Sequence, residues 1–321
     1  MTSNLPSVPE KAKALWRIVK ATGPLLIAQS VKLSEAYAQH NLRLAEVEAI
    51  KELMIGEAKI ITDVRKKLID KYLDASPEDR LRLRQDIDMA ERDLRQLGIY
   101  HKAIEHLPKN ESVTDTASTE ESLNPTPEFK AWLDAFNDYA RKQNEPWRSE
   151  ILARALALES QTPGSVGQRA LWFIGTVDDR EFHAYAALLN ISINLFGSYV
   201  IPNFTNFVER EIPDYFNAPG KQVGQALFIV SNLGLYGDIL QSSKKLPSGS
   251  LLVANYGKRK IVAKLNQDIV VGGVLPTALG DTISKLYEPA INELGLEIFN
   301  NWIDSLKPAH IEILVDAEIA K

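Results

Sequence analysis

The N-terminal third of the chain carries two narrow hydrophobic stripes at helical spacing. In the first, between Val31 and Leu73, apolar residues recur in steps of three, four and seven and therefore share one helix face. The second alternates steps of three and four, as in a coiled coil, and consists of Leu83, Ile87, Ala90, Leu94, Leu97, His101 and Ile104. Together the stripes predict helix over most of residues 9–107.

A break at Asp74–Pro77 separates the two stripes. Ser76 can cap a helix and Pro77 suits a first helical position, so a new helix is expected to begin there. Because the connection is short, the two helices should fold back as a long antiparallel hairpin. Each stripe is narrow, so residues 1–107 are expected to bury it within the hairpin or against a second subunit.

The middle of the chain changes composition twice. Residues 108–127 hold few apolar residues and many Ser, Thr, Asp, Glu and Pro, which predicts a disordered linker between domains. Beyond it, Trp132, Phe136 and Tyr139 return to helical spacing. We therefore expect a compact helical bundle over 128–198.

From residue 199 onwards the pattern mixes helix and strand. The expected elements are a helix at Val223–Leu233 ending at Gly234, a β-hairpin at Ser250–Lys264, a strand at Ile269–Val274, a helix from Thr277 to Leu286, a helix over roughly Pro289–Leu306 and a strand at 310–315. This order favours a winged-helix-like α+β domain over 199–321. The whole chain is expected to be α+β and mostly helical.

Composition excludes some functions without choosing one. The formal net charge of -5 over 321 residues argues against a protein that coats nucleic acid through its overall charge. The absence of cysteine excludes disulfides, thiol nucleophiles and Cys-ligated zinc. The N-terminus lacks the apolar core of a signal peptide, and no run of about 18 uncharged apolar residues occurs. A cytoplasmic protein is therefore expected.

A series of short motifs gives the chain a family resemblance. They are Trp147, Leu152-Ala153, Pro163-Gly164-Ser165, Arg169-Ala170-Leu171, Glu181-Phe182, Leu233-Gly234-Leu235 and Leu275–Gly280, the last of which Pro276 interrupts. Over about residues 128–305 the chain resembles bacterial proteins related to the abortive-infection alpha family. The resemblance implies a bacterial origin and a role in defence against phage, and it brings no catalytic residues with it.

Histidines and carboxylates form no catalytic arrangement in the sequence. His101 and Glu105 lie one turn apart and could share a metal ion, but His106 points elsewhere, so a packed or interfacial histidine is favoured. His183 is expected to be structural, with the neighbouring Asp178-Asp179 capping a helix. No phosphate-binding Gly-x-x-x-x-Gly-Lys run occurs. We therefore expect no catalytic residue, metal or cofactor.

Arg169 is the motif residue best suited to binding. Its guanidinium could hold a phosphate or carboxylate through two hydrogen bonds. It could equally pair with Glu159 or Glu181 and lock helices together. The structural pairing is favoured, so the Trp147–Phe182 region is interpreted as a scaffold, in which a turn at Pro163-Gly164 joins two helices.

Two cationic segments are candidates for contact with other molecules. Lys258, Arg259 and Lys260 form the tip of the expected hairpin and could contact phosphates, although a solvated turn is favoured. An amphipathic helix near the N-terminus could lie on an anionic membrane or dock onto the bundle, and docking is slightly favoured. Its contact residues would be Lys11, Lys13, Trp16, Arg17 and Lys20.

Three functions follow from these features. The first is a non-enzymatic sensor or adaptor in phage defence, acting through protein–protein contacts with its own copies or with an operon-encoded partner. The second is a peripheral lipid-binding protein at the inner membrane. The third is a winged-helix DNA-binding regulator, which is less favoured because the expected recognition region, Lys221–Tyr236, contains no arginine.

Overall fold

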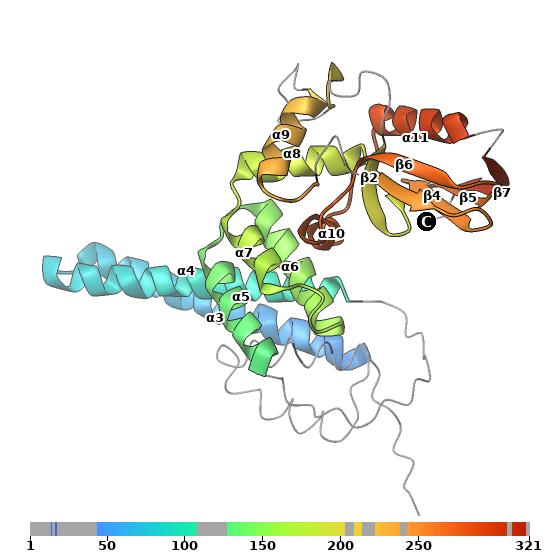
Figure 1. The fold of residues 1–321 in the computed structure, drawn as a ribbon. Coiled ribbons are helices and arrows are strands. Elements are labelled where there is room, and N and C mark those ends of the chain that lie inside the picture. The colour runs from blue at the N-terminus through green and yellow to red at the C-terminus, as the bar shows by residue number, and fades with distance from the viewer. Residues whose placement is uncertain are drawn as a thin grey trace, which may run out of the picture. The chain divides into compact units, whose positions relative to one another are not determined.

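The protein consists of two compact units, residues 1–175 and 176–321 (Figure 1). The computed structural model describes Ala14, Arg17 and residues 44–107, 127–202, 209–213, 222–237, 243–306 and 310–318. In these ranges the first unit is helical, and the second combines helices with a seven-stranded antiparallel sheet. The α+β class predicted from the sequence is confirmed, whereas the predicted linker at 108–127 falls, up to residue 126, outside the described residues.

Two long helices, α3 (Leu44–Asp74) and α4 (Pro77–Glu105), pack along each other in the first unit. The break between them lies where the sequence predicted it. The Ser76 hydroxyl accepts a hydrogen bond from the Asp79 amide at 3.3 Å, and Pro77 occupies the first turn. Apart from Ala14 and Arg17, the helix expected over residues 9–43 lies outside the described part of the chain.

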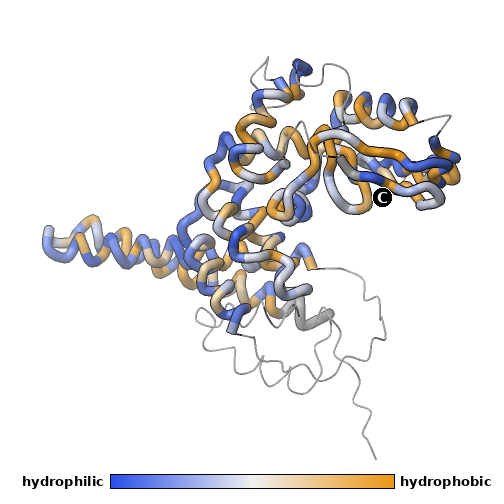
Figure 2. The backbone as a smooth tube through the Cα atoms, viewed as in Figure 1, coloured by the Kyte–Doolittle hydropathy of each residue, from blue (hydrophilic) through white to orange (hydrophobic). Residues whose placement is uncertain are grey.

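Burial along the α3–α4 pair is confined to one end. Ile50, Met54, Leu97 and Tyr100 are buried there, whereas the structure describes all of residues 55–89 and none of these side chains is buried. Hydrophobic and hydrophilic residues alternate along this stretch (Figure 2). The second predicted stripe is therefore buried only in part, at the end where α4 also contacts α5 and α6.

Three shorter helices complete the first unit: α5 (Pro127–Lys142), α6 (Pro146–Gln161) and α7 (Gln168–Thr176). A polar network joins α4 to α5, because Gln96 Nε2 donates to Tyr100 Oη at 3.0 Å and to Asn137 Oδ1 at 2.8 Å. The bundle predicted over 128–198 differs from this unit, since α8 (Asp179–Asn190) and the first two strands belong to the second unit.

The sheet of the second unit has the order β3-β6-β2-β1-β4-β5-β7. Its strands are β1 (Ile193–Leu195), β2 (Ser198–Pro202), β3 (Ser243–Leu246), β4 (Leu251–Tyr256), β5 (Arg259–Leu265), β6 (Ile269–Val274) and β7 (Ile311–Glu318). The predicted hairpin, β4–β5, and the predicted strands β6 and β7 are confirmed. The sequence did not predict β1, β2 or β3. In the sheet, the hairpin β4–β5 lies between β1 and β7.

The helices of the second unit are α8, α9 (Val223–Asn232), α10 (Ala278–Ser284) and α11 (Glu293–Leu306); α8 contacts α9, and α10 contacts β2. Helix α11 packs on β4, where the rings of Tyr256 and Phe299 stack with centroids 6.4 Å apart. Asp178 and Glu181 form a reciprocal cap at the start of α8, which confirms the predicted capping role of Asp178. Helix α11 begins later than the predicted Pro289. No helix within the described ranges is long and apolar enough to cross a membrane.

The end of α9 and the start of α10 meet backbone to backbone. Gly234 ends α9 with a φ of 69°, and Thr277 caps α10 by accepting from the Gly280 amide at 3.1 Å. The Thr277 hydroxyl also donates to the Gly234 carbonyl at 2.6 Å. These are the residues of the last two sequence motifs, which therefore mark a packing junction.

Candidate functional site

A row of aromatic side chains forms one wall of the candidate site. Phe129, Trp132 and Phe136 lie three and four residues apart on α5, so they share its buried face. The rings of Trp132 and Phe136 are 5.2 Å apart and those of Phe129 and Trp132 are 6.2 Å apart, each pair inclined by 16°. Of the three, Phe129 and Trp132 line the candidate site, opposite the turn between α6 and α7.

A buried carboxylate holds that turn in place. Glu159 is 3 % exposed, and its two oxygens accept hydrogen bonds from the amides of Gly164 at 2.6 Å and Val166 at 2.8 Å. Gly164 has a φ of 86°, a conformation that glycine adopts without strain. Glu159 thus ties the predicted Pro-Gly turn to the end of α6. From the sequence, Glu159 was expected only as a possible partner of Arg169.

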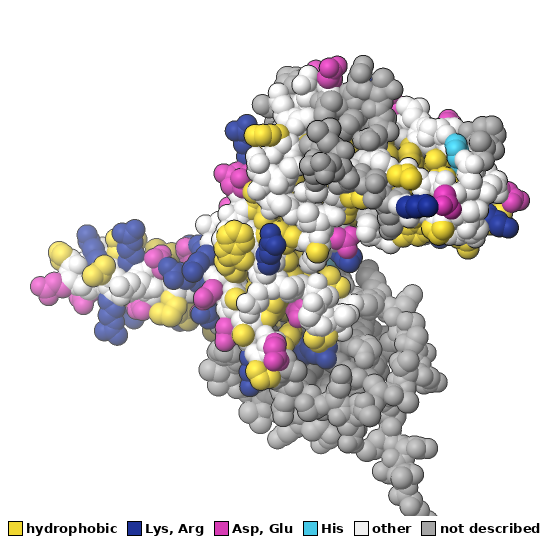
Figure 3. All heavy atoms as spheres, in the orientation of Figure 1, with side chains coloured by type: hydrophobic (Ala, Val, Ile, Leu, Met, Phe, Trp, Pro, Cys, Tyr) yellow, Lys and Arg dark blue, Asp and Glu magenta, His cyan; other side chains and the backbone are white. Residues whose placement is uncertain are grey.

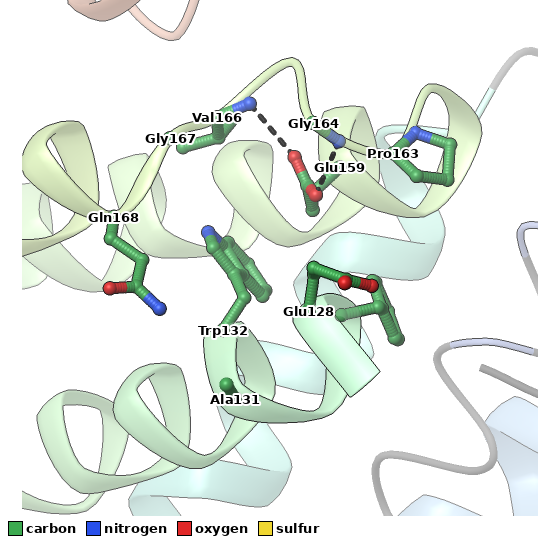
Figure 4. A pocket seen from close by; sticks show the side chains of 10 residues that line it. Glu128, Ala131, Trp132, Glu159, Pro163, Gly164, Val166, Gly167 and Gln168 are labelled. Atoms are coloured by element: carbon green, nitrogen blue, oxygen red, sulfur yellow. Dashed lines mark hydrogen bonds between the residues drawn. The ribbon is translucent and has the colours of Figure 1, made fainter. Parts of the chain in front are cut away.

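A cavity of about 490 Å³ lies between the aromatic wall and this turn (Figure 4). It is lined by Glu128, Phe129, Ala131, Trp132, Glu159, Pro163, Gly164, Val166, Gly167 and Gln168. Figure 4 shows the indole nitrogen of Trp132 on the side of Gln168, facing the space below the turn. Trp132 is 4 % exposed, and no described residue accepts a hydrogen bond from that nitrogen.

The side chains that line this pocket are suited to binding a ligand. Both oxygens of Glu159 are engaged by backbone amides, so this carboxylate is a poor general base in its present position. The remaining lining is apolar or belongs to exposed side chains at the rim, among them Glu128 and Gln168. No group of three potential metal ligands occurs in the parts of the chain that the structure describes.

Arg169 does not form the predicted ion pair. It is exposed and pairs with no described residue, because Glu159 is bonded to the turn and Glu181 belongs to the cap of α8. Among the described residues the buried arginine is Arg148, which is 5 % exposed and donates to the Ile174 carbonyl at 3.0 Å. The guanidinium of Arg148 also lies over the ring of Trp147, 4.6 Å from its centroid.

In each of the two predicted cationic segments, one arginine is bound to another part of the fold. Arg17 Nη1 donates to the Ser160 carbonyl at 2.5 Å and Ala14 is buried, which favours docking of the N-terminal segment; Lys11, Lys13, Trp16 and Lys20 lie outside the described residues. Arg259 forms an ion pair of 3.0 Å with Asp316, whose carboxylate raises the pKa of Arg259. Lys258 is exposed and Lys260 is half-buried in β5.

Lys258 and Arg259 border a second hollow, which lies in the C-terminal unit. It has a volume of about 460 Å³ and is lined by Tyr256, Lys258, Arg259, Ile291, Leu296, Asn300 and Asp316. Because the guanidinium of Arg259 is bound to Asp316 and Asn300, a phosphate would have to displace partners already in place. The hollow therefore offers one exposed cation, Lys258, and a second cation, Arg259, whose charge is neutralised by Asp316.

Three of the described histidines lie beside acidic residues. His101 Nδ1 is 3.9 Å from Glu105 Oε1, and His183 Nδ1 donates a hydrogen bond to the Asp179 carbonyl at 2.7 Å. His106 Nε2 is 2.7 Å from Glu150 Oε1 and so ties α4 to α6. The one-turn spacing of His101 and Glu105 is as predicted.

Glu150 should make the free energy of unfolding depend on pH in the acid range. Burial opposes its ionisation, but the hydrogen bond from Arg154 and the charge of His106 outweigh that effect and lower its pKa from the usual 4.5. A lowered pKa means that Glu150 stabilises the fold above pH 4.5 and that this contribution is lost as the pH falls through the folded-state pKa. Since the pair is partly exposed, we expect Glu150→Gln to cost up to about 1 kcal/mol at neutral pH and nothing in acid.

Urea unfolding at a series of pH values measures this effect. Glu105→Gln is the matched control, because Glu105 is an exposed residue at the end of α4 and, among the described residues, makes only the 3.9 Å contact to His101. A Glu150→Gln deficit that persists unchanged to the most acidic pH contradicts the assignment.

Comparison of the chain with protein-family models, with curated proteins and with solved structures finds no significant match.

Proposed function

We propose that this protein is a non-enzymatic sensor or adaptor that acts through protein–protein contacts, and that the α3–α4 pair joins it to a second copy of itself. The observation that carries the proposal is the exposed apolar stretch between residues 55 and 89. Its large exposed side chains are Ile55 (57 %), Ile60 (58 %), Val64 (46 %), Leu73 (67 %), Leu81 (67 %) and Met89 (57 %). Such a concentration on two helices is typical of an interaction surface.

The exposed apolar residues recur at helical spacing. Ile60 and Val64 are one turn apart on α3, and Leu81 and Met89 are two turns apart on α4, so each pair shares a helix face. Figure 3 shows hydrophobic side chains at the surface of these helices among basic and acidic ones. This arrangement supports packing of another helix along the pair.

Charge balance favours a second copy as the occupant. Between residues 55 and 89 the acidic side chains are Glu57, Asp63, Asp70, Asp74, Glu78, Asp79, Asp86 and Asp88, and the basic ones are Lys59, Arg65, Lys66, Lys67, Lys71, Arg80, Arg82 and Arg84. The two sets are equal in number, so this stretch has no net charge. Two copies can therefore approach without overall repulsion, and a symmetric contact needs only one self-complementary surface.

Light scattering after gel filtration tests the proposal. The wild-type protein is expected to elute above its monomer mass of 35.8 kDa, and the double variant Ile60→Glu, Val64→Glu at that mass. Losing the burial of two such side chains should raise the dimer Kd about 100-fold or more. The control, Lys66→Gln with Lys67→Gln, makes the same charge change on exposed polar positions of α3 and should stay associated.

Two results would sink the proposal. One is a wild-type protein that is monomeric at all concentrations and captures no partner from cells before or during phage infection. The other is equal dissociation of the apolar and control variants, since this would make charge the cause. The defence role is carried by the motif resemblance, and phage plating on cells with the dissociated variant tests it separately.

A further inference from the structure

The cavity beneath the α6–α7 turn contains a hydrogen-bond donor with no acceptor among the described residues. Trp132 is 4 % exposed, yet its indole N–H lacks a partner, and leaving such a buried donor unpaired costs about 1–3 kcal/mol. The nitrogen faces the cavity (Figure 4). We propose that this cavity is a binding site for a small neutral molecule with a flat apolar body and one hydrogen-bond acceptor.

The shape of the ligand follows from the aromatic wall. The rings of Phe129 and Trp132 are inclined by only 16°, so their faces are nearly parallel and a planar molecule can stack in the same orientation. A volume of about 490 Å³ falls in the usual range for small-molecule sites, about 300–1,000 Å³. An acceptor on the ligand's edge would take the hydrogen bond from the Trp132 nitrogen.

The charge of the ligand follows from the two acids of the lining. Glu159 and Glu128 are both within the cavity wall, and the lining includes no basic side chain. An anionic ligand would therefore meet repulsion, while the apolar surface disfavours a strongly hydrated cation. The site is built on the N-terminal unit alone and is independent of the proposed contact along α3–α4.

A matched pair of probes isolates the hydrogen bond. Quinoline is flat and neutral at neutral pH and carries one acceptor nitrogen, whereas naphthalene has the same outline and no acceptor. We expect quinoline to bind about fivefold to tenfold more tightly than naphthalene, the net worth of one hydrogen bond. In ¹⁵N–¹H spectra quinoline should shift one indole signal downfield, and that signal should be the one missing from Trp132→Phe.

Two variants complete the test. Trp132→Phe keeps an aromatic ring and removes the donor, so quinoline should bind it no better than naphthalene. Gly167→Leu leaves Trp132 intact and adds a large side chain to the cavity lining, where a Cβ meets no atom within 4 Å, so both probes are expected to lose binding. The proposal is overturned if quinoline leaves the Trp132 signal unmoved, if naphthalene binds the wild type equally well, or if Gly167→Leu binds quinoline as the wild type does.

Discussion

Replacing Gly280 with alanine should destabilise the C-terminal unit by about 3 kcal/mol. An added Cβ at this position would lie 1.9 Å from the Leu235 carbonyl oxygen, a backbone atom that cannot rotate away. That oxygen also accepts from the Thr277 amide at 2.9 Å. Moving α10 to relieve the clash would therefore stretch the bonds that join it to the end of α9.

The same shift would disturb a buried hydroxyl. Tyr185 Oη donates to the Gly280 carbonyl at 2.7 Å, and Tyr185 is fully buried. Urea unfolding followed by circular dichroism measures the loss. Gly98→Ala is a control of opposite sign: a Cβ there meets nothing within 4 Å, and alanine favours the helix by about 0.5–1 kcal/mol. If both variants change stability alike, close backbone contact is not the cause.

Replacing Glu159 with glutamine should destabilise the N-terminal unit by about 2–3 kcal/mol. Both carboxylate oxygens accept from backbone amides, at 2.6 and 2.8 Å. The glutamine amide has only one oxygen, so its NH₂ group would face either the Gly164 or the Val166 N–H, donor against donor. One buried amide would lose its partner, and the α6–α7 turn would loosen over the pocket.

Glu128→Gln is the matched control for this prediction. Glu128 lines the same pocket and the substitution removes the same charge, but its side chain is exposed at the start of α5. We expect its effect on the free energy of unfolding to stay within about 0.5 kcal/mol. Equal losses in the two variants would assign the effect to the local charge and would contradict the role of the two amide bonds.

Elements with strong local signals were predictable from the sequence. Ser76-Pro77 and Thr277 began helices as expected, and the alternation in residues 250–264 produced a hairpin. The hairpin β1–β2 was missed because its turn is Phe196-Gly197, with φ values of 53° and 89°. Such two-residue turns usually carry Asn-Gly or Asp-Gly, and a phenylalanine with positive φ gives no signal of that kind.

The pocket depends on contacts between α5 and the α6–α7 turn, which the spacing of residues along the chain cannot reveal. The sequence indicated the Pro163-Gly164 turn and the aromatic face of α5, but nothing in it brings the two together. Glu159 was weighed as an ion-pair partner of Arg169, whereas in the fold the amides of its own turn satisfy it. A carboxylate on the buried face of a helix, five residues before a glycine, was the only available signal.

The centre of the sheet is made from its earliest strands. Hairpin β1–β2 pairs with β4 on one side and with β6 on the other, and both of these strands come later in the chain. During synthesis the hairpin therefore leaves the ribosome with both flanks lacking neighbours, and open strand flanks invite pairing with other chains. This unit stays exposed to misassembly until the chain has been made as far as Val274.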